Sequence, residues 1–293
     1  MKKLLATTAL ACLVALMAIP FAMADFSAVT STASITNAAP TVGEVTATDP
    51  VSLSESTNVT VWCNATVTDT NGYADVSTVS AKLWDPAATT EGGSDDYNNH
   101  YTNSSCSLSG GSGTTVSAAC RFNAYYSANA AEWTCKLTAT DGSLATGTAN
   151  VTTVTVNQLK ALSIVSATMA FSELALGATS SDYNMSVNNT GNTQIDVSVD
   201  GYGAGDGDGY AMTCTIGGSE ISLSNLKYNL TVSQDYTANM TALTDSAVTL
   251  SDFNLAAETT DGAGSTNSIY WKLKIPSTDV GGSCSGNVVI TAV

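Results

Sequence analysis

Apolar and polar positions alternate strictly in several short segments, and this pattern predicts half-buried β-strands. In residues 56–69 the odd positions from Val59 to Val67 are apolar or cysteine, whereas the even ones are polar apart from Trp62. Residues 133–139 repeat the alternation. A period of two points one set of side chains into a core and the other into solvent. Further strands are predicted near residues 41–47, 79–84, 102–108, 114–122 and 148–156. About seven short strands are typical of a β-sandwich.

The second half of the chain predicts another sandwich. After a short joint at residues 157–162 the alternation resumes in residues 183–187 and again in residues 195–199. We therefore expect an all-β protein made of two tandem antiparallel β-sandwiches, the first over residues 38–157 and the second over residues 158–293.

The first residues of the chain are typical of an export signal. Lys2 and Lys3 precede the apolar stretch 4–21, and Ala22-Met23-Ala24 then forms a small-x-small cleavage site. We expect residues 1–24 to be a cleaved signal peptide and residues 25–37 an extended or disordered leader. The alternative is an uncleaved membrane anchor, but the stretch is short for a bilayer span. No second apolar run follows, so no transmembrane segment is expected after cleavage.

The charge of the chain excludes two classes of partner. There are 25 acidic and 9 basic residues, and the formal net charge is −16. A surface of this sign repels nucleic-acid phosphates and anionic lipid head groups. A nucleic-acid partner is therefore not expected. The same negative surface favours solubility and the binding of divalent cations.

The cysteine count indicates disulfides. Of seven cysteines, Cys12 leaves with the signal peptide, and the remaining even number in an exported chain is typical of a disulfide framework. No closely spaced pair suggests a metal or redox site. Four cysteines fall in the first predicted domain, where three pairings stay open. The two in the second, Cys214 and Cys284, form a natural pair.

Two motifs of the first domain resemble a known group of proteins. The segments Trp62-Cys63-Asn64-Ala-Thr-Val-Thr-Asp69-Thr-Asn71-Gly72 and Trp133-Thr-Cys135-Lys-Leu-Thr-Ala-Thr-Asp141-Gly142 resemble the immunoglobulin-like modules of secreted prokaryotic, especially archaeal, cell-surface proteins. The resemblance implies an inter-sheet Cys63–Cys135 disulfide and display outside the cell.

With that disulfide, Cys106 and Cys120 would close a glycine-rich hairpin. The chain departs from the antibody pattern because no core tryptophan is predicted midway on the third strand, where Trp84 falls on the outward parity. The second half resembles another surface-protein sandwich in its turn-rich style, and so two immunoglobulin-like sandwiches are expected.

The sequence contains eight Asn-x-Ser/Thr motifs, which are acceptor sites for glycans in secreted proteins. Several of their asparagines fall on the outward parity of a predicted strand, where a glycan would leave the core undisturbed. Chance matches in a chain rich in Asn, Ser and Thr are the alternative. The candidate sites are Asn58, Asn64, Asn103, Asn150, Asn184, Asn188, Asn229 and Asn239.

Two groups of acids are candidates for calcium, the one cofactor that the sequence suggests. The loop 200–209 places Asp200, Asp206 and Asp208 on a glycine-rich backbone. A second group, Asp69, Asn71, Asp75 and Asp141, would form if two turns meet at one end of the sandwich. Ca²⁺ binds carboxylate and carbonyl oxygens of this kind. Solvated turns explain both groups equally well.

Catalytic chemistry has little support in the sequence. His100 is the one histidine, and it falls in a polar loop where an isolated exposed imidazole is expected. A serine-hydrolase arrangement would need this histidine in a supported pocket, and a zinc hydrolase would need further histidines. Neither condition is met, and we expect no enzyme.

Three functions agree with these features. The first is a secreted, non-enzymatic structural or adhesive glycoprotein of the cell surface, whose partners are other surface proteins or itself. The second is a subunit of a pilus-like filament in which the leader 25–37 adds as a strand to the next molecule. The third is a carbohydrate-binding module, suggested by outward Trp62 and Trp84 with Tyr125 and Tyr126.

Overall fold

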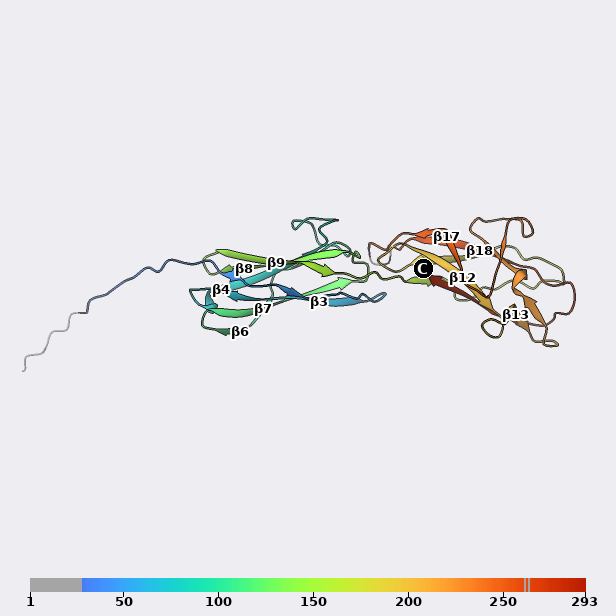
Figure 1. Cartoon of the computed structure of the whole chain (residues 1–293), viewed down its shortest axis with the longest axis horizontal. Helices are drawn as coiled ribbons and strands as arrows, with labels where there is room; N and C mark the ends of the chain where they lie inside the picture. The colour runs from blue at the N-terminus through green and yellow to red at the C-terminus, as the bar shows by residue number, and fades with distance from the viewer. Residues whose placement is uncertain (1–27, 261, 263) are drawn as a thin grey trace, which may run out of the picture. The chain divides into compact units, whose positions relative to one another are not determined.

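The computed structural model describes residues 28–260, 262 and 264–293. The predicted signal peptide and the first residues of the predicted leader, 25–27, lie outside the described residues. Residues 37–293 form a compact unit whose regular elements are nearly all strands (Figure 1). Two 3₁₀ turns, η1 (Tyr73–Asp75) and η2 (Leu223–Asn225), are the helical elements of the described chain. The prediction of an all-β, immunoglobulin-like fold is confirmed. Within the described residues, no helix combines the length and hydrophobicity that spanning a membrane requires.

The first sandwich consists of two antiparallel sheets. One sheet has the order β1-β3-β7-β6, with β2 also pairing with β3, and the other has the order β5-β4-β8-β9. The strands of the first sheet are β1 (Thr41–Val42), β2 (Thr46–Ala47), β3 (Asn58–Thr68), β6 (Ser107–Ser112) and β7 (Thr115–Tyr125). Those of the second are β4 (Val76–Trp84), β5 (His100–Asn103), β8 (Glu132–Asp141) and β9 (Thr146–Thr155). This order corresponds to strands A-B-E-D and C′-C-F-G of immunoglobulin sandwiches.

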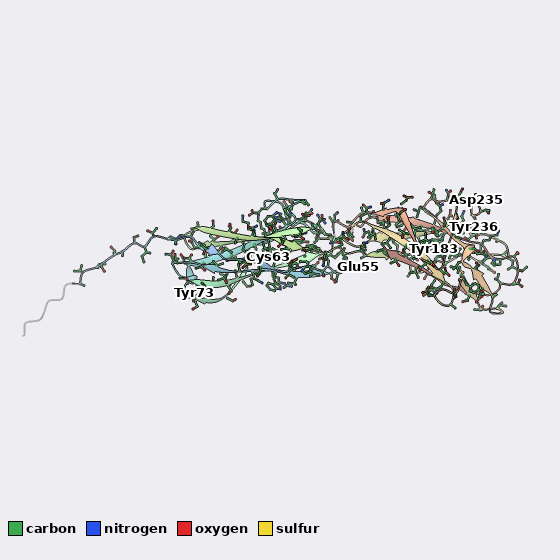
Figure 2. All side chains as sticks on the ribbon, in the orientation of Figure 1. Glu55, Cys63, Tyr73, Tyr183, Asp235 and Tyr236 are labelled. Atoms are coloured by element: carbon green, nitrogen blue, oxygen red, sulfur yellow. A yellow bond between two sulfur atoms is a disulfide. The ribbon has the colours of Figure 1, made fainter. Side chains whose placement is uncertain are left out.

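Two disulfides lie in the core of the first sandwich. Cys63 on β3 is bonded to Cys135 on β8, which joins the two sheets as in immunoglobulin domains. Cys106 is bonded to Cys120 on β7. Figure 2 shows Cys63 inside this sandwich. Each bridge contributes about 2 to 4 kcal/mol by restricting the unfolded chain.

The alternation predicted for β3 appears as alternating burial. Val61, Cys63 and Val67 are buried, whereas Trp62 between them is exposed. The large core aromatic is Trp133 on β8, which is buried and stacks on the ring of Tyr101.

The expectation for two other aromatic residues is wrong. Trp84 was predicted to face outward from the parity of β4, but it is buried, and so is Tyr126. Trp84 is the last residue of β4, where parity along a strand loses its meaning as the chain turns. Of the four aromatics proposed as a sugar-binding surface, Trp62 is exposed and Tyr125 is half-buried.

The second sandwich has a different strand arrangement. One layer is the five-stranded sheet β10-β11-β18-β15-β16, and the others are the three-stranded sheets β17-β12-β20 and β14-β13-β19. The first layer comprises β10 (Leu162–Ile164), β11 (Tyr183–Asn189), β15 (Leu226–Asn229), β16 (Thr241–Ala242) and β18 (Thr266–Leu273). The rest are β12 (Ile195–Tyr202), β13 (Tyr210–Cys214), β14 (Glu220–Ser222), β17 (Val248–Leu255), β19 (Cys284–Ser285) and β20 (Asn287–Ala292).

A separate hydrophobic core fills this second sandwich. Its largest fully buried side chains include Trp271 and Phe253, and Val197 and Val199 of β12 are also fully buried. Cys214 is bonded to Cys284, and these residues face each other in the β13–β19 pairing. The sandwich therefore has its own core and its own disulfide.

Candidate metal centre

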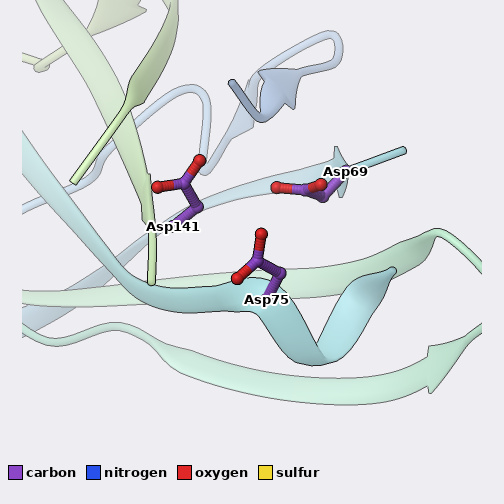
Figure 3. A group of neighbouring side chains, drawn as sticks. All are labelled: Asp69, Asp75 and Asp141. Carbon is purple, nitrogen blue, oxygen red and sulfur yellow. The ribbon is translucent and has the colours of Figure 1, made fainter. Parts of the chain in front are cut away.

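Three aspartates converge in the first sandwich, although Asp141 is far from Asp69 and Asp75 in the sequence. Asp69 follows β3, Asp75 ends η1 and Asp141 ends β8. One carboxylate oxygen from each lies within 4.8 Å of the others. Figure 3 shows the three carboxylates pointing toward a common point. The structure thus brings together the acids that the sequence placed in two turns.

Burial and hydrogen bonding differ among the three side chains. Asp69 and Asp141 are fully buried, whereas Asp75 is half-buried. Oδ1 of Asp69 accepts a hydrogen bond from the backbone N–H of Asn71 at 2.8 Å. Oδ2 of Asp69 is buried and has no hydrogen-bond partner among the described residues. No described group donates to the carboxylate of Asp75.

Asp141 organises the turn that follows β8. Its Oδ1 accepts hydrogen bonds from the backbone N–H groups of Ser143 at 2.9 Å and Ala145 at 2.8 Å. Its Oδ2 accepts from Nδ2 of Asn37 at 2.7 Å. The Asn37 amide is the main cause that lowers the pKa of Asp141 below its ordinary value. The two backbone N–H groups act in the same direction, against the effect of burial. Asp141 is therefore ionised at neutral pH.

Asn71, the fourth member of the predicted group, lies at the edge of the cluster. Its Oδ1 accepts from the backbone N–H of Ala38 at 2.8 Å. Asn71 and Asp141 thus both hold the chain at residues 37–38, where the compact unit begins.

The acids of the loop 200–209 do not form such a group in the described part of the chain. Instead, the carboxylate of Asp208 accepts four backbone hydrogen bonds. The donors are the N–H groups of Gly203, Ala204, Gly205 and Tyr210, at 2.7 to 3.1 Å. These bonds, led by the one from Tyr210, lower the pKa of Asp208 to about 2.

The backbone conformation of this loop explains why two of its positions are glycine. Gly207 and Gly209 adopt φ angles of +76° and +80°, which side chains with a Cβ atom rarely take. Asp206 is exposed and Asp200 is half-buried. The structure therefore gives no geometric support to the predicted calcium site at Asp200, Asp206 and Asp208, because backbone N–H groups already occupy the oxygens of Asp208.

His100 is fully buried, which corrects the expectation of an exposed imidazole. Its Nδ1 lies 2.8 Å from Oδ1 of Asp95, and its Nε2 lies 3.1 Å from the carbonyl oxygen of Glu91. Lys82 donates to the same carbonyl at 2.7 Å. Both ring nitrogens are thus engaged by oxygen atoms of the loop that precedes β5.

None of the eight predicted glycan acceptors is buried. Asn58, Asn64, Asn150, Asn184 and Asn239 are exposed. Asn103, Asn188 and Asn229 are half-buried. In Asn103 and Asn229 the amide nitrogen that would carry a glycan donates to a backbone carbonyl, and glycosylation itself stays a prediction.

The sequence did not reveal a groove in the second sandwich, which both apolar and polar residues line. The groove has a volume of about 1200 Å³ and lies between the segment 164–176, several core strands and the segment 280–288. Met185, Leu226 and other core side chains reach it. The segment 164–176 is rich in apolar residues, and this richness was the one sign of the groove in the sequence. The segment lacks the strict alternation that predicts a strand.

Comparisons with known proteins assign no family. No protein-family model matches the chain, and no curated protein matches it. Among solved structures, it is similar to a chain of the complex between a chaperone and the tip adhesion subunit of archaic chaperone–usher Csu pili from Acinetobacter baumannii. The sequence identity is 10%, the TM-score is 0.40, and the match covers 85% of this chain and 99% of that one. Similarity at this level assigns no function.

Proposed function

We propose that this protein is a secreted, non-enzymatic structural or adhesive glycoprotein of the cell surface. The observation that carries the proposal is the set of three disulfides, which includes every cysteine among the described residues. Disulfides of this kind form and persist outside the cytoplasm. The net charge of −16 suits a soluble, exposed surface.

Two features support the absence of catalysis in this proposal. The one histidine of the sequence is enclosed, with Asp95 and a backbone carbonyl on its ring nitrogens. The converging aspartates lie in the turns of a sandwich and not in the groove, which is in the other half of the chain. The partners that we propose are other surface proteins or further copies of this chain.

Localisation on intact cells tests the proposal. Cells that express the chain are treated with a protease that does not enter them, and the released peptides are identified by mass spectrometry. We expect non-reduced peptides that contain the Cys63–Cys135 bridge, and a mature chain that begins at Asp25. Glycan masses on the eight acceptor peptides would test the glycoprotein part. A chain that stays inside the cells with free thiols would contradict the proposal.

A second candidate function is a filament subunit that donates a strand to the next copy. Residues 28–36 are mostly exposed, and the side chains of Val29 and Ile35 are 90% and 87% exposed. In the second sandwich, β20 pairs with β12, and no other described strand pairs with its free edge. The groove adjoins this region, since Asn287 and Val288 of β20 line it. An extended segment with apolar side chains is the natural occupant of such an edge and groove.

Electron microscopy of the purified protein separates the two functions. For strand donation, we expect filaments that disappear when residues 25–37 are deleted or when Val29 and Ile35 are both replaced by Asp. The matched control replaces Thr30 and Thr36 by Asp, because these side chains have the opposite parity on an extended strand. Filaments that persist in the Val29/Ile35 variant would contradict strand donation while leaving the surface role intact.

A further inference from the structure

A buried carboxylate oxygen without a partner belongs to Asp69, whose carboxylate converges with those of Asp75 and Asp141. We propose that these three aspartates bind a Ca²⁺ ion. Oδ2 of Asp69 is inaccessible to solvent and accepts no hydrogen bond from a described residue. Native proteins rarely leave such an oxygen unsatisfied, because burying an unpaired polar atom is costly. A cation at the common point of Figure 3 would satisfy it.

The charges of the cluster are not balanced by the protein. Three carboxylates have oxygens within 4.8 Å of one another. The ion pairs among the described residues are His100–Asp95, Lys136–Glu91 and Lys272–Asp182, and none includes a member of the cluster. Like charges at this separation repel, most strongly where water is excluded. A bound cation would remove this repulsion.

The chemistry of the ligands selects calcium among the common cations. The three carboxylates provide only oxygen atoms, which hard cations prefer, whereas zinc sites are usually built with cysteine or histidine. Ca²⁺ takes six to eight oxygens in flexible geometry, and the half-buried position of Asp75 leaves access for water ligands. Mg²⁺ demands near-ideal octahedral geometry with shorter bonds, which two separate turns provide less readily.

The position of the site gives the ion a mechanical effect. Asp69 follows β3 of one sheet, whereas Asp75 and Asp141 adjoin β4 and β8 of the other. An ion held by all three would link the two sheets at the end of the sandwich. Asn37 donates to Asp141, and the backbone N–H of Ala38 donates to Asn71. An ion at this site would therefore also fix the point where the compact unit begins.

Calorimetric titration of the purified, EGTA-treated protein tests the site. We expect one Ca²⁺ ion with a Kd of about 10⁻⁴ M, as in extracellular modules, and at least tenfold weaker binding of Mg²⁺. Asp75→Asn should weaken Ca²⁺ binding at least tenfold. This substitution is the safest for folding, because no described group donates to the carboxylate of Asp75. The matched control is Asp206→Asn in the other acidic loop, which should bind Ca²⁺ as the unmodified protein does.

Thermal unfolding provides a second readout, because calcium should reverse the order of the two melting temperatures. Without calcium, Asp75→Asn should unfold at the same temperature as the unmodified protein or a few degrees higher, because one repelling charge is gone. With 5 mM CaCl₂, the unmodified protein should gain several degrees and the variant little. The proposal is overturned if the unmodified protein neither binds nor gains stability at 5 mM Ca²⁺. It is equally overturned if Asp75→Asn binds Ca²⁺ normally, or if Asp206→Asn abolishes binding.

Discussion

The turns around Asp69 and around Asp208 both carry more than one acid, but they differ in how the carboxylates are satisfied. In the turn 200–209, one carboxylate accepts four backbone N–H groups, and the chain closes on itself. In the turn 69–75, Asp69 accepts one backbone N–H and keeps a buried oxygen without a partner. The carboxylate of Asp69 lies close to those of Asp75 and of a third acid, Asp141, at the end of β8 in the other sheet (Figure 3).

This difference makes Asp208 an acid that holds its own turn together and Asp69 a candidate ligand for a cation. Asp208 needs no cation because neighbouring amides already stabilise its charge, as the lowering of its pKa to about 2 reflects. Asp69 accepts only one such N–H and Asp75 accepts none from a described residue, and both carboxylates lie close to that of Asp141. The density of acids along the sequence is therefore a poor guide to a cation site, and the hydrogen bonds that remain unmade are a better one.

Removing Asp141 should have the largest effect on stability. Asp141→Ala leaves the N–H groups of Ser143 and Ala145 and the amide of Asn37 without their acceptor. We expect the melting temperature in calcium-free buffer to fall by about 5 °C or more, because lost hydrogen bonds outweigh the relief of charge repulsion. Differential scanning calorimetry measures this change. An unchanged melting temperature would show that the turn after β8 does not depend on its carboxylate.

Removing Asp208 should have a smaller effect, although it loses more backbone bonds. Asp208→Ala affects an open loop whose N–H groups, including that of Ala204, can turn to water. We expect a fall of about 2 to 4 °C in melting temperature and faster amide exchange at residues 203–205. Calorimetry and hydrogen exchange measure the two effects. A loss equal to that of Asp141→Ala would erase the distinction between the two turns.

The charge of Asp208 should also appear in the acid stability of the protein. Its folded-state pKa of about 2 lies below its ordinary value of 3.8, so the unfolded state binds the proton more readily. The stabilisation is therefore complete above about pH 4 and is lost as the pH falls toward 2. Asp208→Asn should remove this part of the pH dependence, as measured by unfolding at pH 5, 4, 3 and 2. Parallel curves for the two proteins would contradict the assignment.

Asp206 should have the smallest effect of all. It is exposed, and its carboxylate accepts no hydrogen bond from a described residue. We expect Asp206→Asn to change the melting temperature by less than about 1 °C, because exposed acids outside such networks contribute little. A clear loss of stability that depends on calcium would instead revive the site predicted for the loop 200–209.

The sequence predicted the β architecture well because alternation is a local property. Inward parity on β3 and β8 placed Cys63 and Cys135 on facing sides of a core, and these residues are bonded in the structure. The same parity misjudged Trp84, since the rule applies within a strand and weakens where the strand ends. It gave no indication of His100, whose burial depends on a loop that folds back and brings Asp95 and Glu91 to the ring.

The sequence by itself determined the strands, the faces they bury, the separate cores and the set of cysteines available for bridges. The tertiary structure alone decided that Asp141 meets Asp69 and Asp75 while Asp200, Asp206 and Asp208 stay apart. The physical reason is the distance along the sequence over which each property is set. Side-chain parity follows from the backbone repeat within a few residues, whereas the meeting of two turns depends on how strands far apart in the chain pair and on how two sheets pack.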